Sequence, residues 1–343
     1  MKLAFTPYNE NRVDCYWNNV FGIMMTRNPS FRILVPLVSS RYEMPIADQS
    51  RMSEEQFQHW QNNGLLLPHV RKWFPDKIFQ QYMKAIDIPV SVNTDIMDTI
   101  KQYIREGIYC FVRLNRFHLS ICPEFGKEEL VHPIMIYGFD EDRKVVHLIE
   151  DCSSRFESYE VSYHEIEASY ESIAAEEKLA LGIQVLSDRL SEHVPVETIL
   201  QNIEVQLNSE SVVQDNITYI KGFEAVKQYR HRFHEAAARV TVADTNVHNR
   251  LSTPVFYQQR NLMLVEYLMN VGILLERDGK ELLNHFTKLH QTWGLIRSKL
   301  LIYIMMETKP EAAQYFVRMD EYIAECLQEE LLLEQMVNHL RYA

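Results

Sequence analysis

The pattern of hydrophobic and polar positions changes along the chain. Nine of the twelve prolines lie in the first 133 residues, where short apolar runs alternate with turn residues. Such punctuation is typical of short helices and strands, because proline interrupts both. The runs predict helices over 16–26, 93–106 and 163–173 and strands over 108–114, 131–139 and 144–150, the last two joined as a hairpin.

The rest of the chain carries long amphipathic patterns with few turn residues. They predict helices over Phe223–Arg239, Gln258–Leu275, Leu282–Met306 and Glu311–Leu340. The segment SDRLSEHVP (187–195) separates the two patterns and is the expected domain boundary. We therefore expect an α+β fold, with an antiparallel sheet in a first domain over 1–187, followed by an all-α helical domain over 196–343.

The composition is that of an ordinary globular protein. Hydrophobic residues make up 46% and charged residues 24%, and 35 Lys and Arg against 47 Asp and Glu give a net charge of −12. Long-range repulsion opposes binding of such a chain to nucleic acid or to an anionic membrane, so we expect neither partner. No apolar run approaches the roughly 18–20 residues of a membrane span, and the N-terminus does not resemble a signal peptide, so we expect a cytoplasmic protein.

The cysteines are odd in number and show no CxxC spacing, which predicts neither a disulfide framework nor a zinc site. They are Cys15, Cys110, Cys122, Cys152 and Cys326. The chain also lacks GxxxxGK[ST], GxGxxG and GxSxG, which argues against a P-loop NTPase, a dinucleotide-binding enzyme and an α/β hydrolase. We expect no bound metal or cofactor. In a reducing compartment, a free thiol then either packs in the core or takes part in catalysis.

Cys15 stands directly before the predicted helix over 16–26. The N–H groups at a helix N-terminus carry partial positive charge, which favours a thiolate there and helps to bind an oxyanion. A catalytic cysteine also needs a histidine and a third group that orients that histidine. Buried packing is the alternative role for this thiol.

The predicted hairpin offers the histidine and its orienting group. A turn centred between Glu141 and Asp142 places His132 opposite Asp151, with Cβ atoms about 4.5–5.5 Å apart. The alternative carboxylate, Asp140, lies about 26 Å from His132 at the extended-strand rise per residue. We therefore predict Cys15 as nucleophile, His132 as base and Asp151 as the residue that orients the ring.

Other candidates rank below this set. His118 has no carboxylate at a matching spacing, and Cys110, Cys122, Cys152 and Cys326 are expected to serve packing. His231 and His234, with Glu235, are spaced by three residues rather than the four of HExxH, and we expect no metal there. The same stretch, Lys227 to Arg239, is the densest basic cluster, which is either a solvated helix face or a surface for an acidic partner.

Three segments carry a resemblance to a known family. RVDCYWNNVFGIM (12–24), FHLSICPEFGKEELVHPIMIYGFDED (117–142) and HLIED (147–151) resemble the N-terminal domain of the butirosin biosynthesis protein H family. That domain is similar to papain-like cysteine enzymes, in particular to bacteriocin-processing peptidases. The resemblance covers about residues 5–175, and in that family a separate helical domain follows.

The resemblance implies a cysteine-dependent acyltransferase of natural-product biosynthesis. Such a protein takes an acyl group from the phosphopantetheine thioester of an acyl or peptidyl carrier protein and passes it to a small-molecule amine. Carried over by position, Cys15, His132 and Asp151 form the triad. Papain-like enzymes place a Gln about six residues before the cysteine to build the oxyanion hole; here that position is Asn9, whose side chain is shorter.

Two other functions stay open at this stage. A cysteine peptidase or amidase uses the same thiolate with water as the acceptor. A non-catalytic scaffold keeps the fold and binds a partner through its helical part. The hydrophobic helix faces also permit a homodimer.

Overall fold

The computed structural model describes residues 1–11, 13–37, 39–47, 49–55, 57, 69–73, 79–152, 155–190, 208–214, 216–239, 247–306, 310–311, 315 and 317–342. The chain divides into two compact units. The first consists of Met1–Arg32 and Asp76–His193, and the second of Ile33–Pro75 and Val194–Ala343. Part of the expected boundary, residues 191–195, lies outside the described residues.

A six-stranded antiparallel sheet forms the centre of the first unit, in the order β3-β8-β4-β5-β6-β7. Its strands are β3 (Met83–Asp87), β4 (Tyr109–Asn115), β5 (Val131–Asp140), β6 (Val145–Glu150), β7 (Glu157–Ser162) and β8 (Ala180–Val185). The predicted strand over 108–114 and the predicted hairpin over 131–150 are confirmed as β4, β5 and β6. They are buried on both faces, which explains their nearly continuous apolar sequence.

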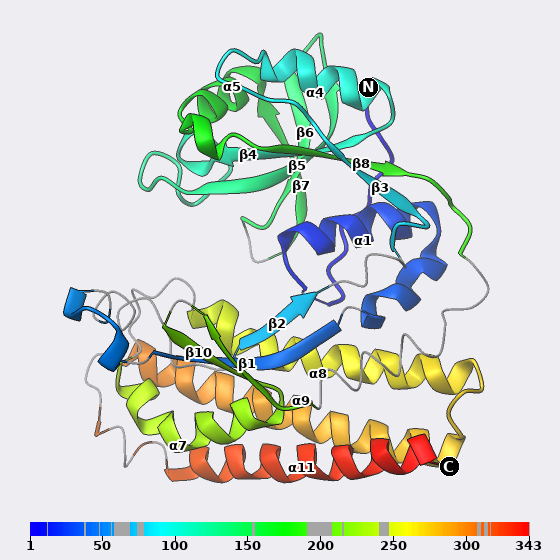
Figure 1. Ribbon diagram of the computed structural model, residues 1–343. Coiled ribbons are helices and arrows are strands. Elements are labelled where there is room, and N and C mark those ends of the chain that lie inside the picture. Colours follow the sequence, from blue (N-terminus) through cyan, green and yellow to red (C-terminus); the bar gives the residue numbers. More distant parts are fainter. Residues whose placement is uncertain are drawn as a thin grey trace. The chain divides into compact units, whose positions relative to one another are not determined.

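Helices cover both faces of this sheet (Figure 1). The helices α4 (Ile96–Arg105) and α5 (Tyr163–Glu171) cover one face, where alternate residues of β4 and β5 join their core. On the other face lies α1 (Cys15–Arg27), whose Tyr16 ring is 4.9 Å from that of Phe111 on β4. Side chains on a strand alternate between the two faces of the sheet, so alternate residues of a strand pack against helices on opposite faces.

Local sequence signals account for the helix ends in this unit. The side chain of Asp95 accepts a 2.8 Å bond from the backbone of Asp98 and caps α4, so the helix begins three residues later than the predicted helix over 93–106. Gly107 follows the helix with φ of 81°, a conformation that favours glycine at a helix end. A capping box between Ser162 and Glu165 starts α5.

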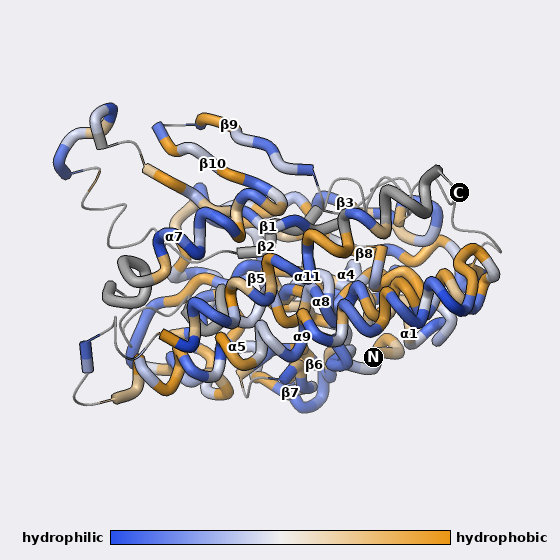
Figure 2. Tube along the Cα trace, turned by 90° about the horizontal axis from the view of Figure 1, so that it is seen from below, coloured by the Kyte–Doolittle hydropathy of each residue, from blue (hydrophilic) through white to orange (hydrophobic). Residues whose placement is uncertain are grey.

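The second unit combines a sheet with long helices. The sheet has the order β2-β1-β10-β9, with β1 (Ser39–Ala47), β2 (His69–Trp73), β9 (Glu210–Gln214) and β10 (Ile217–Lys221). The helices are α7 (Phe223–Arg239), α8 (Val247–Asn270), α9 (Glu276–Met305) and α11 (Val317–Tyr342). Figure 2 shows hydrophobic and hydrophilic positions alternating along these helices, in keeping with the predicted amphipathic patterns.

Short 3-10 helices complete the described elements. They are η1 (Pro29–Leu37), η2 (Gln49–Arg51), η3 (Arg116–His118) and η4 (Ala175–Glu177). The third of them follows β4 directly and carries Arg116, a residue of the site described below.

The expectation of an all-α second part is wrong. The β9–β10 hairpin precedes α7, and β10 pairs antiparallel with β1, for example Glu43 with Lys221. This long-range pairing draws residues 33–75 into the second unit, so neither unit is a single continuous segment of chain. The mixed α and β character that the sequence predicts is confirmed for the chain as a whole.

A buried polar cluster lies in the core of the second unit. The amide of Gln258 on α8 donates to the hydroxyl of Tyr42 at 2.6 Å and to the carboxyl of Glu330 on α11 at 3.1 Å. Asn261 in turn donates to Gln258 at 3.1 Å. Burial raises the pKa of Glu330 to about 7, and the bonds from Tyr42 and Gln258 only partly offset this.

Replacement of Glu330 by Gln is expected to remove a pH dependence of folding. The pKa of Glu330 in the folded state lies above its value in the unfolded state. The folded wild type is therefore most stable, as far as this group is concerned, below about pH 4.5, and it loses that stability as pH rises toward 7. The shift from 4.5 to about 7 corresponds to a loss of about 3 kcal/mol. Free energies of unfolding at pH 5 and pH 8 measure it, with Glu321→Gln on the exposed side of α11 as control. Parallel pH profiles for all three proteins contradict the prediction.

Candidate active site

Cys15 is the first residue of α1, as the sequence predicts. The side chain of Asp14 caps the helix by accepting a bond of 2.7 Å from the backbone N–H of Trp17. The Cys15 side chain is partly exposed. The helix end therefore presents a thiol to solvent beside N–H groups that favour negative charge.

Asn18 holds the loop that leads into α1. Its buried side-chain oxygen accepts from the backbone N–H groups of Val13 at 2.7 Å and Asp14 at 3.1 Å. Its amide donates to the backbone oxygens of Tyr8 at 3.1 Å and Asn11 at 2.8 Å. The sequence analysis missed this role. Its signal is the pair of adjacent amides, Asn18 and Asn19, about one turn after Cys15 in a mainly apolar run.

Asp151 lies beside the thiol. The Cys15 Sγ is 3.8 Å from Asp151 Oδ2, and Asp151 Oδ1 accepts a bond of 2.7 Å from Arg116 Nη2. The structure thus brings together two of the three predicted triad residues. The guanidinium neutralises the carboxylate, which would otherwise oppose a thiolate at this distance.

His132 contacts a different carboxylate. Its Nδ1 is 3.3 Å from Glu150 Oε2, and the Glu150 side chain is 2% exposed. Glu150 Oε1 also accepts from Arg116 Nη2 at 2.5 Å and from the backbone N–H of Asp151 at 2.9 Å. The carboxylate that orients the ring is therefore that of Glu150, the residue before the predicted one.

The hairpin turn is longer than the prediction assumed. Asp140 pairs with Val145, so residues 141–144 form a four-residue connection rather than a turn centred between Glu141 and Asp142. The side chain of Asp140 accepts two backbone bonds of 3.0 Å within this turn. Its role is to hold the turn, far from the ring along the strand.

A β-bulge adds a second displacement. The longer turn displaces the pairing by two residues from the prediction. The bulge lies just before Gly138 on β5 and moves the register back by one residue, so the net displacement from the predicted pairing is one residue. A displacement of one residue exchanges the faces of a strand. Glu150 therefore shares a face with His132, and Asp151 is turned to the face that α1 covers. The predicted pairing of His132 with Asp151 is wrong for this reason.

Arg116 links the Cys15–Asp151 contact to the His132–Glu150 contact. Besides Glu150 and Asp151, it reaches Glu124 Oε1 at 3.4 Å through Nη1, and its side chain is 9% exposed. Burial disfavours its charged form, but the carboxylates of Glu150 and Asp151 outweigh burial and raise the pKa of Arg116. A continuous series of contacts thus runs from Cys15 through Asp151, Arg116 and Glu150 to His132. The sequence analysis named neither Arg116 nor Glu150; the pair of adjacent acids in HLIED is the signal it passed over.

The predicted oxyanion residue serves another contact. The Asn9 amide donates to the backbone oxygen of Phe156 at 3.0 Å, and its side-chain oxygen accepts from the backbone N–H of Phe156 at 2.9 Å. Asn9 thus joins the N-terminal segment to the chain before β7. Its amide is turned to that backbone and does not serve as the predicted donor to an oxyanion in this conformation.

The remaining sequence candidates separate clearly. Cys110 and Cys326 are buried in the cores of their units, and burial raises the pKa of Cys110 to about 12. His118 ends η3, and its ring lies 5.1 Å from that of Phe117. Packing roles for these cysteines agree with the sequence analysis.

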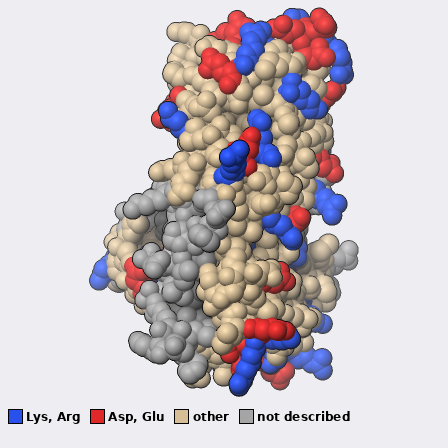
Figure 3. Space-filling model, turned by 90° about the vertical axis from the view of Figure 1, so that its right-hand side faces the viewer, with Lys and Arg blue, Asp and Glu red and all other residues tan. Residues whose placement is uncertain are grey.

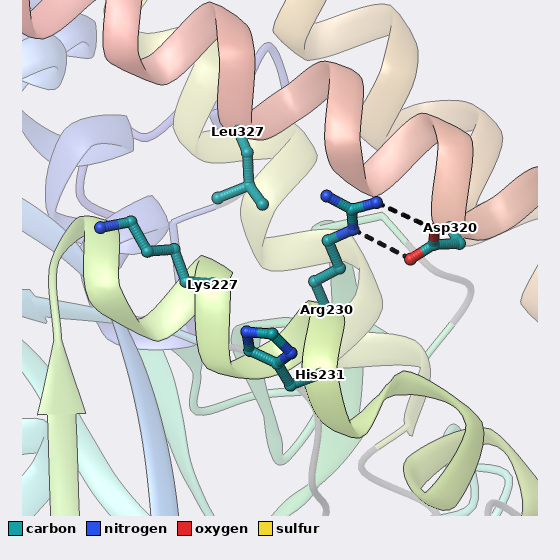
Figure 4. A pocket seen from close by; sticks show the side chains of 5 residues that line it. All are labelled: Lys227, Arg230, His231, Asp320 and Leu327. Atoms are coloured by element: carbon teal, nitrogen blue, oxygen red, sulfur yellow. Dashed lines mark hydrogen bonds and ion pairs between the residues drawn. The ribbon is translucent and has the colours of Figure 1, made fainter.

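The basic stretch lines a surface pocket in the second unit. Figure 4 shows Lys227, Arg230 and His231 on α7 facing Asp320 and Leu327 on α11, around a space of about 590 Å³. Arg230 donates from Nε and Nη2 to the two oxygens of Asp320, each at 3.0 Å. The side chains of the histidine at 234 and the glutamate at 235 lie outside the described residues.

One face of the molecule carries mixed charge, and the described residues hold no cluster of metal ligands. Lys and Arg lie in small groups beside Asp and Glu on the face drawn in Figure 3. Among the described residues, no three His, Cys, Asp or Glu side chains are arranged to hold a metal ion. None of the described helices is long and apolar enough to cross a membrane.

Neither the family models nor the curated proteins contain a match to this chain.

Proposed function

We propose that the protein is a cysteine-dependent acyltransferase with Cys15 as its nucleophile. One observation carries the proposal: the Cys15 thiol lies at the N-terminus of α1, 3.8 Å from Asp151, in a contact series that includes His132. The resemblance to the butirosin biosynthesis protein H family supports it, and that membership is part of the proposal.

The reaction has two steps. The Cys15 thiolate attacks the carbonyl carbon of an acyl thioester, and the C–S bond to the donor breaks, which releases the donor thiolate and leaves an acyl-cysteine. An amine then attacks the acyl-cysteine, loses a proton and releases the Cys15 thiolate. The N–H groups of the first turn of α1 face the developing oxyanion in both steps.

His132 carries the proton in this scheme. Glu150 occupies Nδ1, so Nε2 is the nitrogen that accepts the thiol proton and returns it to the leaving group. The ring lies on the face of β5 opposite to the one that α1 covers and is 21% exposed, so in this scheme solvent water carries the proton between the thiol and the ring. Asp151, neutralised by Arg116, holds the resting thiol at the helix end.

The expected donor is the phosphopantetheine arm of an acyl or peptidyl carrier protein, and the expected acceptor is a small amine. Both come from the resemblance, as does a place in natural-product biosynthesis. The basic stretch of α7 is the proposed docking surface for an acidic carrier protein, with Lys227 and Arg230 exchanging their present partners, Glu224 and Asp320, for carboxylates of the carrier.

The experiment that tests the function is incubation with an acyl thioester of N-acetylcysteamine. We expect an acyl adduct on the tryptic peptide 13–27, which contains Cys15 as its sole cysteine, and transfer of the acyl group when an amine is added. Water as the preferred acceptor assigns the protein as a hydrolase instead. An adduct distributed equally over the cysteine peptides contradicts a nucleophilic role for Cys15.

Two matched variants identify the carboxylate that orients His132. We expect Glu150→Gln to lower the rate of acyl transfer by roughly 10²-fold, since the ring loses the anion at Nδ1. Asp151→Asn is expected to change mainly the rate at which Cys15 is alkylated, because Asp151 contacts the thiol whereas Glu150 contacts the imidazole ring. Initial rates of transfer and of iodoacetamide labelling measure both. Equal effects of the two variants on transfer contradict the assignment.

A non-catalytic scaffold is the second candidate function. The observation that favours it is the position of two predicted site residues: His132 faces Glu150, and Asn9 faces the backbone of Phe156. In that case Cys15 labels with iodoacetamide below pH 7 no faster than an unactivated thiol.

A further inference from the structure

Two cysteines outside the proposed mechanism lie in contact. The Sγ atoms of Cys122 and Cys152 are 3.4 Å apart. Cys122 is buried in the turn that follows η3, and Cys152 is partly exposed directly after β6. Thirty positions separate them in the sequence, so the fold and not the local chain brings these thiols together.

We infer that Cys122 and Cys152 form a dithiol site that a hydroperoxide oxidises to a disulfide. The covalent S–S distance is about 2.05 Å, so the sulfurs have to approach by roughly 1.4 Å. Both residues lie in turns rather than in a helix or strand, so this approach breaks no ladder or helix bond.

The two thiols have different roles in the oxidation. Contact with Cys152 and burial raise the pKa of Cys122, which keeps that thiol protonated. Cys152 is the more exposed of the two thiols, so it meets the peroxide first, takes one oxygen as a sulfenic acid and releases an alcohol, or water from hydrogen peroxide. The Cys122 sulfur then attacks the Cys152 sulfur, and the sulfenic oxygen leaves as water. The peroxide is reduced by two electrons, and the two thiols together are oxidised by two.

The disulfide would link the two chain segments that carry carboxylate partners of Arg116. Cys152 follows Asp151, which accepts from Nη2 of Arg116, and the turn of Cys122 carries Glu124, which accepts from Nη1. A disulfide ties the turn after η3 to the end of β6, and thereby fixes two of the carboxylates that surround the guanidinium. The proposed oxidation needs no reaction at Cys15 and is independent of the acyltransferase proposal.

Peptide mapping of the full chain tests the inference. Reduced protein is treated with one molar equivalent of hydrogen peroxide, then blocked with an alkylating reagent and digested with trypsin. Each cysteine falls in its own tryptic peptide, and those of Cys122 and Cys152 are 117–127 and 145–155. We expect these two peptides to appear as one linked species, two hydrogens lighter than their sum, that dithiothreitol separates.

Cysteine variants distinguish this pair from other oxidations. Cys122→Ser is expected to abolish the linked species and to leave Cys152 as a sulfenic acid that dimedone traps. Cys110→Ser, at a buried site, is expected to leave the linkage intact. Mapping of the wild type needs no variant, so a Cys122→Ser protein that fails to fold does not affect that result. Linkage of peptide 145–155 to the Cys15 peptide 13–27, or no linkage at all, overturns the inference.

Discussion

Replacing Cys15 by Ala is expected to lower the rate of acyl transfer by roughly 10⁴-fold or more, to that of the reaction without protein. The thiol forms the acyl intermediate in the proposed scheme, and an alanine methyl group has no lone pair with which to attack a thioester. The measurement is the initial rate of amide formation from an acyl thioester and an amine. A Cys15→Ala protein that retains the wild-type rate contradicts the scheme.

Cys152→Ser is the matched control for this loss. Cys152 is also partly exposed and lies next to Asp151, but its sulfur contacts Cys122. Under reducing conditions, we expect this variant to transfer the acyl group within a few-fold of the wild type. A comparable loss in both variants would mean that the reaction depends on the local structure around Asp151 rather than on the Cys15 thiol.

Local periodicity was sufficient to predict the elements that carry the site. The helix after Cys15, the strand over 109–115 and the hairpin all follow from short apolar runs bounded by turn residues. Proximity of Cys15 and Asp151 also agrees with the prediction. The elements depend on local signals, which a single sequence contains, whereas Cys15 and Asp151 are 136 positions apart and were placed together by the predicted triad.

The register of the hairpin required more than its own residues. The N-terminal segment pairs with β5 at the bulge, where Lys2 bridges Gly138. A Cβ at position 138 would lie 3.0 Å from the Cα of Lys2 and from a ring carbon of His147, so this close approach favours glycine. A glycine within a predicted strand indicates a bulge, and this signal stood in YGFD.

The sheet of the second unit was missed for a related reason. Its central pairing joins β1 to β10 across a separation of nearly half the chain, and neither strand predicts the other. A local signal existed only for the β9–β10 hairpin, whose turn contains Asn216 with φ of 62°. Long helical patterns on the C-terminal side of these strands favoured an all-α interpretation, because helices depend on local periodicity and strands on distant partners.

Replacing Arg116 by Met is expected to destabilise the protein by about 3–5 kcal/mol, because it leaves buried carboxylates without their cation. Glu150 and Asp151 each accept from this guanidinium, and their side chains are 2% and 11% exposed. Methionine has a similar length but no charge, so packing changes less than electrostatics. Urea unfolding of the wild type and the variant near pH 7 measures the difference.

Arg113→Met, on β4 three residues before Arg116, is the control. Its guanidinium is 3.5 Å from Glu177, and the two side chains are 30% and 46% exposed, so we expect a loss of less than about 1 kcal/mol. Adding Glu150→Gln to Arg116→Met removes one of the uncompensated charges and is expected to restore part of the lost stability. If Arg116→Met costs no more than Arg113→Met, the cation does not hold the two carboxylates in place, and the contact series between Cys15 and His132 loses its central member.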